Sequence, residues 1–574
     1  MSNKEVAKIL REIGEYLDMQ EVPFKPRAYE KAADALDDLE EDLRGIYERG
    51  GLKALEGIPG VGVSIAEKIE ELLRTGKLKY YEKLKHKMPV DLAELTGIEG
   101  LGPKKIQVLY KKLGIKNLKN LEEAIKKGKI RKLEGFGEKS EENIMRGIEF
   151  LKKSSGRFLL VPIMPAIDDL VANLRKVPGV SRIDTAGSTR RWKETIGDID
   201  ILAASYQPKK IMDAFVNMPE VAMKLAHGPT KSAVKLKNGL DVDLRVVPEK
   251  SYGAALNYFT GSKAHNIALR QLAIEHGWKL NEYGLFKGKT QIAGKTEEEL
   301  YKKLGLIYIP PEMRENTGEI ELAAKDNLPK LIEYGTIAGD LQVQTTWSDG
   351  ANSIEEMANA AIGMRLEYIA ITDHTKRLAM TGGLDEKRLR QQGKEIDKIN
   401  LKFKISNLKF RILKSTECDI LKDGSLDLKD DVLAELDIVG ASVHSYFNLP
   451  EHEQTERIIK AMKNKNVDIV FHPTGRVIGK RDPYKVDIDK IISVAKETGT
   501  VLEINSYPDR SDLKDEYIRK CVDAGVKLAI DSDAHSVSHL KFLDYGISQA
   551  RRGWAKKSDI INAWPVEKML SMLK

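Results

Sequence analysis

One pattern repeats from about residue 367 to residue 535: a short apolar run that ends in a polar residue able to bind a metal ion, followed by a segment with helical spacing. The runs include LEYIAITDH, LDIVGASVHS, VDIVFHPTGR and VKLAIDSDAH. Alternating strands and helices predict parallel strands, and polar residues gathered at strand carboxyl ends are typical of a closed or nearly closed β/α barrel. The pattern therefore constrains the C-terminal half of the chain to an α/β fold.

The polar residues at these strand ends form one candidate metal-binding set. A single histidine after a strand is more often a satisfied core residue, but four of the ten histidines in the chain occupy such positions. Four imidazoles beside three carboxylates favour a site for a borderline metal ion. The candidate ligands are Asp349, His374, Glu417, His444, His472, Asp533 and His535.

Two glutamines lie in the first predicted strand of this half, in the segment GDLQVQTTWSDG that begins at Gly339. Residues two apart in a strand point to the same face, so the Gln342 and Gln344 amides are expected side by side at the strand's carboxyl end. A neutral amide oxygen is a poor ligand for Zn²⁺ or Mn²⁺. Because α/β proteins usually bind ligands at the carboxyl ends of their strands, the pair is expected to face a candidate site.

A second metal site is indicated by acidic residues in the middle of the chain. In TIGDIDIL, Asp198 and Asp200 share one face of a predicted strand, with Cα atoms about 7 Å apart. In LDVDLRVV, Asp241 and Asp243 alternate with apolar residues on a second strand. Acidic pairs on strands are usually only solvated, but three carboxylates converging from two strands suit a pair of Mg²⁺ or Mn²⁺ ions.

A glycine–serine pair precedes the first acidic strand and makes this interpretation more specific. Gly187 and Ser188, followed by Gly197 and the Asp-x-Asp of the strand, form a nucleotidyltransferase signature. In that signature the glycine turn and the serine hold a triphosphate while the aspartates hold metal. The combination predicts nucleotidyl transfer.

The first 150 residues contain a glycine pattern three times, in GIPGVGVSIAEKI, GIEGLGPKKIQVL and LEGFGEKSEENI. Each copy places a Gly-x-Gly turn before a helix, whose exposed backbone amides can bind a DNA phosphate without reading a base. Residues 101–150 hold 13 Lys and Arg against 7 Asp and Glu, although a solvated helical face would have the same composition. The pattern resembles helix-hairpin-helix motifs and predicts sequence-independent DNA binding at Gly60, Gly62, Gly100, Gly102, Gly135 and Gly137.

Composition bounds the remaining choices. With 574 residues, 32% charged and 41% hydrophobic, the chain is expected to form several well-solvated domains. Two cysteines exclude a disulfide framework. Since we find neither an export signal nor a spanning segment, we expect a cytoplasmic protein without a membrane partner.

These motifs together resemble a family X DNA polymerase, the DNA polymerase beta group, over residues 1 to about 318. The resemblance implies Asp198, Asp200 and Asp243 as metal-binding catalytic carboxylates, with Asp241 as the competing third candidate. YFTGSKAHNIALR is similar to the nucleotide-binding segment of the family's thumb. The implied nucleotide-binding residues are Gly187, Ser188, Arg191, Gly197, Tyr258, Phe259, Gly261, Lys263, Asn266 and Arg270.

Two further residues follow from this resemblance. Lys68 in SIAEKI is similar to the lysine that forms a Schiff base with a 5′-deoxyribose phosphate, although a surface lysine touching phosphate would fit as well. Imine chemistry would require that the pKa of this amine be lowered. Lys263 stands where DNA polymerase beta carries an acidic residue, so the affinity for the nucleotide substrate is expected to differ between the two.

The C-terminal half resembles the PHP domain, a trinuclear metal hydrolase with a distorted seven-stranded barrel. The resemblance implies a Mn²⁺- or Zn²⁺-dependent 3′–5′ exonuclease or AP endonuclease. The family pattern in the first strand is Asp-Leu-His-x-His, and here Gln342 and Gln344 replace both histidines. We therefore expect a weakened nuclease.

The expected fold is multidomain, mixed α+β and α/β, with helical domains, a nucleotidyltransferase palm, a thumb and a C-terminal distorted (β/α)7 barrel. The expected domains are residues 1–85 (helix-hairpin-helix), 86–152 (a second such domain), 153–252 (palm), 253–318 (thumb), 319–335 (linker) and 336–574 (PHP barrel).

The expected function is template-dependent, gap-filling DNA polymerisation in repair by a monomer. The substrates are dNTPs and gapped or nicked DNA, and the polymerase ion is Mg²⁺ or Mn²⁺. Two alternatives remain. One is a metal-dependent exonuclease or AP endonuclease that uses the polymerase core to grip DNA, and the other is a nonenzymatic DNA scaffold.

Overall fold

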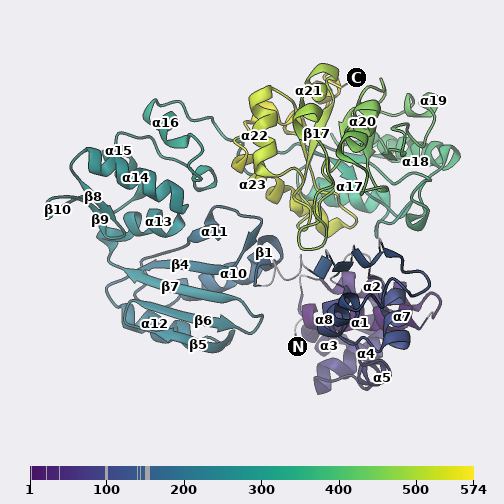
Figure 1. The fold of residues 1–574 in the computed structure, drawn as a ribbon, viewed down its shortest axis with the longest axis horizontal. Coiled ribbons are helices and arrows are strands. Elements are labelled where there is room, and N and C mark those ends of the chain that lie inside the picture. The colour runs from purple at the N-terminus through teal and green to yellow at the C-terminus, as the bar shows by residue number, and fades with distance from the viewer. Residues whose placement is uncertain are drawn as a thin grey trace. The chain divides into compact units, whose positions relative to one another are not determined.

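The computed structural model describes residues 1–573 except 2, 21, 38, 40, 97, 99, 100, 139, 143, 146 and 149–155. The chain divides into two compact units (Figure 1). One comprises residues 1–155 with 479–481, and the other comprises residues 156–478 with 482–574. None of the described helices is long and apolar enough to span a membrane.

The first unit is helical. Its apolar residues recur at helical spacing, so that Val6, Leu10, Ile13 and Leu17 of α1 all lie in one core. Its named helices are α1 (Asn3–Met19), α2 (Lys25–Asp37), α3 (Leu43–Glu56), α4 (Val63–Thr75), α5 (Lys79–Lys87), α6 (Leu92–Thr96), α7 (Pro103–Leu113) and α8 (Leu118–Lys126).

A five-stranded sheet forms the predicted palm, in the order β2-β4-β7-β6-β5. On β4, the apolar residues Ile199 and Ile201 are buried against α10 and α12 while Asp198 and Asp200 face the other side. The strands are β2 (Arg182–Thr185), β4 (Asp198–Ala204), β5 (Val221–His227), β6 (Lys231–Leu236) and β7 (Asp241–Val247). The surrounding elements are β1 (Phe158–Leu159), α10 (Leu160–Arg175), α11 (Gly187–Arg190), β3 (Thr195–Ile196) and α12 (Pro208–Val216).

The predicted thumb combines helices with a three-stranded antiparallel sheet. Its elements are α13 (Tyr252–Thr260), α14 (Lys263–Glu275), β8 (Lys279–Asn281), β9 (Gly284–Lys287), β10 (Thr290–Ala293) and α15 (Glu297–Lys303). The predicted linker contains α16 (Glu319–Ala324), and its Glu319 Oε1 lies 2.7 Å from Nδ1 of the buried His265 on α14. α16 therefore packs on the thumb.

The C-terminal barrel is closed and parallel. A sheet of order β11-β12-β13 and one of order β14-β15-β16-β17-β18 are joined on both sides, by bridges between His374 and Glu417 and between Val343 and Ala534. Only Ser415 and Thr416 separate β13 from β14, so these two segments share one position and the barrel has seven. This confirms the predicted seven-stranded α/β barrel.

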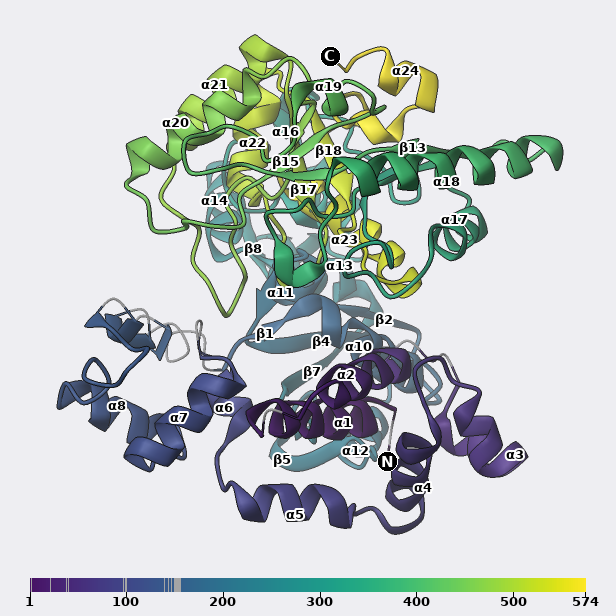
Figure 2. The ribbon, with the colours of Figure 1, turned by 90° about the vertical axis from the view of Figure 1, so that its right-hand side faces the viewer.

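The barrel strands are β11 (Gly339–Val343), β12 (Tyr368–Ile371), β13 (Arg411–Lys414), β14 (Glu417–Asp419), β15 (Gly440–Ser442), β16 (Ile469–Val470), β17 (Val501–Asn505) and β18 (Leu528–Asp531). Its helices are α17 (Ile354–Gly363), α18 (Glu386–Ile405), α19 (Asp430–Leu433), α20 (Glu451–Met462), α21 (Ile488–Thr498), α22 (Asp515–Ala524), α23 (Leu543–Arg552) and α24 (Val566–Leu570). Figure 2 shows the helices surrounding the strands.

Candidate polymerase, hydrolase and DNA-binding sites

The acidic residues of the palm lie on one face of two neighbouring strands. β4 and β7 are parallel, with Asp198 opposite Asp241 and Asp200 opposite Asp243. The side chains of paired residues on adjacent strands point the same way, so the carboxylates line one face of the sheet. The carboxylates of Asp198, Asp200 and Asp243 do not all lie within 4.8 Å of one another.

Asp200 is the most perturbed member of this group. Burial, and then the negative charges of Asp198 and Asp243, raise its pKa to about 6. Carboxylates that repel one another in a partly buried site are suited to hold a divalent cation. A Cβ at Gly187, whose φ is 60°, would overlap the carboxylate of Asp200, so the glycine turn packs directly on the acidic site.

The two candidates for the third carboxylate have different partners. Asp243 Oδ2 lies 2.8 Å from Nζ of Lys231, which is on β6, and the Asp243 side chain is 27% exposed. Asp241 pairs with Lys235, and its side chain is 46% exposed. The more buried Asp243 faces Asp200 and is favoured as the ligand. Lys231 was not anticipated, because its contact with Asp243 depends on the pairing of β6 with β7.

Arg191, predicted to contact triphosphate, is mostly buried. Its Nη1 donates to the carbonyl of Thr260, and its Nε lies 3.2 Å from Glu315 Oε1. At Gly261, whose φ is 75°, a Cβ would lie 2.9 Å from Arg191 Nη1. The arginine and the thumb glycine thus meet, with Glu315 as a partner that sequence reasoning missed. Ser188 lies in α11, and Gly197 directly precedes Asp198 at the start of β4.

The thumb residues predicted to bind nucleotide lie on α13 and α14. The Tyr258 and Phe259 rings meet edge to face at 5.1 Å, and the Arg245 guanidinium of β7 lies 4.4 Å from the Phe259 ring. Asn266 Nδ2 donates to the carbonyl of Tyr258 at 2.7 Å, while its buried Oδ1 has no hydrogen-bond partner among the described residues. Such an acceptor is suited to a ligand donor. Arg270 and Lys263 are exposed on the same helix.

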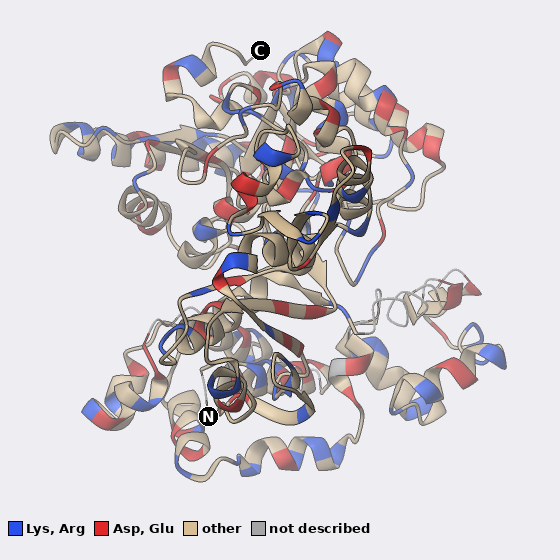
Figure 3. Ribbon diagram, turned by 90° about the vertical axis from the view of Figure 1, so that its left-hand side faces the viewer, with Lys and Arg blue, Asp and Glu red and all other residues tan. Residues whose placement is uncertain are grey.

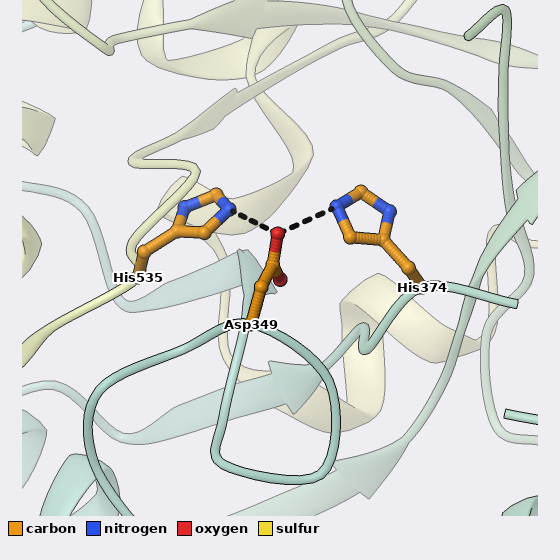
Figure 4. Close-up of side chains that lie close together, drawn as sticks. All are labelled: Asp349, His374 and His535. Carbon is orange, nitrogen blue, oxygen red and sulfur yellow. Dashed lines mark ion pairs between the residues drawn. The ribbon is translucent and has the colours of Figure 1, made fainter. Parts of the chain in front are cut away.

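Two groups of barrel side chains could each hold a metal ion. Figure 4 shows Asp349 between His374 and His535, with its Oδ2 3.7 and 3.8 Å from their Nε2 atoms. The second group is His374, Glu417 and His444. Each group combines imidazole and carboxylate donors, which suits Zn²⁺ or Mn²⁺.

Glu417 is the centre of the barrel site. Its Oε1 lies 3.0 Å from His444 Nε2 and 2.9 Å from His472 Nε2, and it also accepts a hydrogen bond from Ser442. Burial lowers the pKa of His444, but the charges of Glu417 and Asp419 outweigh it and raise the value to about 9. The buried Nδ1 of His472 has no hydrogen-bond partner in the described part of the chain, and the Nδ1 atoms of His374 and His444 lie 3.3 Å from carboxylate oxygens of Glu417 and Asp419. The donor set therefore fits a metal.

The first-strand glutamines are buried and hydrogen-bonded within the site. Gln344 Nε2 donates to Glu417 Oε2 at 2.8 Å, and Gln342 Oε1 accepts from Asn505 Nδ2 at 3.2 Å. Asn505 also donates to Asp533 Oδ2 at 3.1 Å, and Arg510 Nε lies 3.3 Å from the same oxygen. Asp533 therefore faces an amide and a guanidinium, outside both three-residue groups.

In the first unit, Lys68 lies close to two aromatic rings. Its Nζ donates to the Ser64 carbonyl at 2.7 Å and lies 5.1 Å from the Tyr80 ring and 6.0 Å from the Tyr29 ring. Burial lowers the pKa of the amine.

Five of the six predicted phosphate-binding glycines lie among the described residues of the same unit. Gly62 and Gly102 cap α4 and α7 with extended backbones, and a Cβ at either would meet open space. Gly60 and Gly135 have φ values of 79° and 81°, and the carbonyl of Gly137 accepts from the Glu141 amide. Gly100 lies outside the described residues. Figure 3 shows Lys and Arg along α5 and α7.

Comparisons with known proteins cover the whole chain. Residues 1–78 match the helix-hairpin-helix domain, residues 92–149 the SAM-like helix-hairpin-helix tandem, residues 255–315 the DNA polymerase beta thumb and residues 340–507 the PHP domain. The chain is 40% identical over 582 aligned residues to the DNA polymerase/3′-5′ exonuclease PolX of Bacillus subtilis, and the match covers 100% of both chains. It is 32% identical over 195 residues to a probable phosphatase of a Thermoanaerobacter species, covering 32% of this chain and 73% of the relative. A probable phosphatase of Acetivibrio thermocellus is 30% identical over 200 residues with the same coverage.

Proposed function

The chain belongs to the PolX family, the family X DNA polymerases that carry a C-terminal PHP domain, and from this premise we propose that it fills short gaps during DNA repair by two-metal nucleotidyl transfer. The chain is a DNA polymerase, and its helix-hairpin-helix domains imply that it binds DNA as well as dNTP. The observation that carries the mechanism is the set of in-register carboxylates on β4 and β7, with the raised pKa of Asp200.

The palm residues have distinct roles in this proposal. Asp198, Asp200 and Asp243 would hold Mg²⁺ or Mn²⁺, which when bound would make the primer 3′ hydroxyl a better nucleophile and neutralise charge on the phosphoryl group. Lys231 partly neutralises Asp243 beforehand. Ser188 and Arg191 bind the triphosphate, and Arg191 does so by exchanging its pairing with Glu315 for the phosphate oxygens.

The thumb residues hold the rest of the nucleotide. Tyr258 and Phe259 lie against the sugar, with Phe259 fixed by Arg245. The unpaired Oδ1 of Asn266 accepts a hydrogen bond from the incoming nucleotide, and Arg270 contacts the template. Glycine hairpins grip the DNA backbone without reading its sequence.

One assay tests this assignment. A single-nucleotide gap is incubated with dNTP and Mg²⁺ or Mn²⁺, and wild type is compared with Asp198→Ala. We expect incorporation to be lost in the variant. Asp241→Asn is the matched control, because it removes a carboxylate from the same face of the sheet and should retain activity. Extension by Asp198→Ala would show that the triad is wrongly assigned.

We further propose that the PHP domain is a weakened 3′–5′ exonuclease. The residues present fit metal in the groups around Asp349 and Glu417, but the Gln344 amide occupies Glu417 Oε2 and Gln342 is bonded to Asn505. Metal bound there would activate water and stabilise the departing oxygen. Glu417, His444 and His472 would position that metal ion. Asp533 would contribute little to metal binding while it pairs with Arg510.

The exonuclease proposal has its own test. A DNA with a labelled 3′ end is incubated with Mn²⁺ and no dNTP. We expect slow degradation by wild type, and both faster degradation and more bound metal in the double variant Gln342→His, Gln344→His. Vigorous wild-type degradation that is lost on His472→Ala would overturn the proposal.

A 5′-deoxyribose phosphate lyase activity is a second candidate function, favoured by Lys68. Its amine has a lowered pKa and is held beside Tyr80, which suits imine formation. Borohydride should trap wild type on DNA with an incised abasic site and should not trap Lys68→Ala. Equal trapping of both proteins would assign the imine to another amine.

A further inference from the structure

The loop of residues 191–194 connects the two parts of the polymerase site. It follows α11, which carries the Gly187-Ser188 signature, and it precedes β3 and the first metal carboxylate, Asp198. Inside the palm it is tied to the signature, because the Lys193 amide donates to the Ser188 carbonyl at 3.0 Å. A displacement of this loop would therefore move the groups that bind triphosphate.

Barrel side chains contact both ends of this loop, at Arg191 and at Glu194. Arg552 Nη1 donates to the Arg191 carbonyl at 2.8 Å. Arg476 Nη1 lies 3.1 Å from Glu194 Oε2, and Gln549 Nε2 lies 2.8 Å from Glu194 Oε1. The three barrel side chains are almost fully buried, with 6, 4 and 4% of the surface of Arg552, Arg476 and Gln549 exposed.

Trp192, at the centre of the loop, is held by aromatic rings. Its ring lies 6.2 Å from that of Tyr545 on α23 and 6.3 Å from that of Tyr334, just before the barrel. Its φ of 53° lies in the left-handed region that favours glycine. A bulky residue keeps such a backbone only where its surroundings fix it, and here two rings from outside the palm contribute to doing so.

Glu315 joins the loop to the barrel by charge. Its Oε1 lies 3.2 Å from Arg191 Nε, 3.0 Å from Lys193 Nζ and 3.4 Å from Arg552 Nη1. Arg552 also pairs with Asp515 of α22, which fixes its guanidinium from the barrel side. Arg552 thus contacts the backbone carbonyl of Arg191 and also Glu315, the acid that pairs with the Arg191 side chain.

The three contacts from α23 share one face of that helix. Tyr545, Gln549 and Arg552 are spaced by four and three residues, so they form one stripe, and this stripe faces the loop. Figures 1 and 2 show α23 beside α11. None of these residues belongs to the barrel's candidate metal site.

We propose that the PHP barrel positions the nucleotide-binding loop of the polymerase, with Arg552 as the principal positioning residue and Arg476 and Gln549 as supports. This role needs no hydrolysis, so it is retained in a barrel whose metal site contains Gln342 and Gln344. It goes beyond the proposed function, because it assigns to the barrel a part in dNTP binding.

The test measures KM for dNTP and kcat in single-nucleotide gap filling by the full chain. For Arg552→Ala we expect KM to rise about tenfold, the loss that corresponds to one hydrogen bond from a charged donor, with kcat and DNA affinity little changed. Arg552→Lys keeps one donor and should recover part of the loss. Hydrogen exchange should increase over residues 187–196 and stay unchanged over β14–β18.

Two further variants keep the test decisive. Glu194→Gln weakens the loop's other anchor and should raise KM in the same direction, which tests the proposal if Arg552→Ala does not fold. Arg390→Ala is the matched control, because this exposed arginine of α18 pairs with Asp431 and Glu435 of the barrel, and its loss should leave KM unchanged. Unchanged KM in folded Arg552→Ala and Glu194→Gln, or an equal rise in Arg390→Ala, would overturn the proposal.

Discussion

Replacing Asp200 with asparagine should abolish polymerisation and at the same time stabilise the palm when divalent metal is removed. Burial and the neighbouring charges of Asp198 and Asp243 raise the pKa of Asp200 from 3.8 to about 6. The folded palm therefore disfavours the ionised carboxylate that the reaction needs. Asparagine has nearly the same shape and no charge.

The size of the effect follows from the pKa change. At about 1.4 kcal/mol for each pKa unit, the ionised carboxylate costs the folded state about 3 kcal/mol at pH 7. Because the folded-state pKa is raised, this cost is absent below about pH 4 and develops as the pH rises through 6. The gain in stability of Asp200→Asn should follow the same course, full at pH 7 and lost at pH 4.

Two experiments measure this gain in stability, both in a metal chelator at pH 7 and pH 4. They are hydrogen exchange over β4 and β7 and thermal unfolding. Asp241→Asn is the control, since it removes only a half-exposed ion pair with Lys235 and should change stability by less than about 1 kcal/mol. The reasoning is refuted if Asp200→Asn is no more stable than Asp241→Asn at pH 7, or if its advantage persists at pH 4.

Three further outcomes are expected. Lys231→Met removes a cation that lowers the pKa of Asp200, so the acid limb of the pH–rate profile should move to higher pH, and a shift to lower pH would contradict this. Gly261→Ala places a Cβ on a backbone with a φ of 75°, 2.9 Å from Arg191 Nη1, and should destabilise the thumb by about 1–2 kcal/mol and raise KM for dNTP, as thermal unfolding and gap filling will measure. Lys104→Ala on α7 should weaken binding to gapped DNA, because this lysine is expected to contact a phosphate. The slope of log K against log salt concentration should become less steep by about one, and an unchanged slope would show that Lys104 does not contact the DNA.

Much of the architecture could be predicted from local pattern. Alternation in DIDIL and DVDLR predicts two strands with acids on one face, and the structure contains both. The barrel histidines each follow their own apolar run, so their convergence requires only that parallel strands end together. Five of the seven predicted barrel ligands fall in the two compact groups.

The partners of these residues could not be predicted in the same way. Glu315 meets Arg191 across 124 residues, and Arg552 meets the Arg191 carbonyl across 361. No periodicity encodes such distant contacts. Asn505 is a different case, because it ends the run TVLEIN and its position at the end of a strand could have included it in the candidate site.

The boundary between polymerase and barrel in the sequence is not a boundary in the packing. A chain cut at residue 335 would keep every catalytic carboxylate, but Glu194 would lose both hydrogen-bond donors and Trp192 one of its two aromatic neighbours. The polymerase part and the barrel are therefore expected to function together. A polymerase core isolated from the barrel is therefore expected to show a higher KM for dNTP than the full chain.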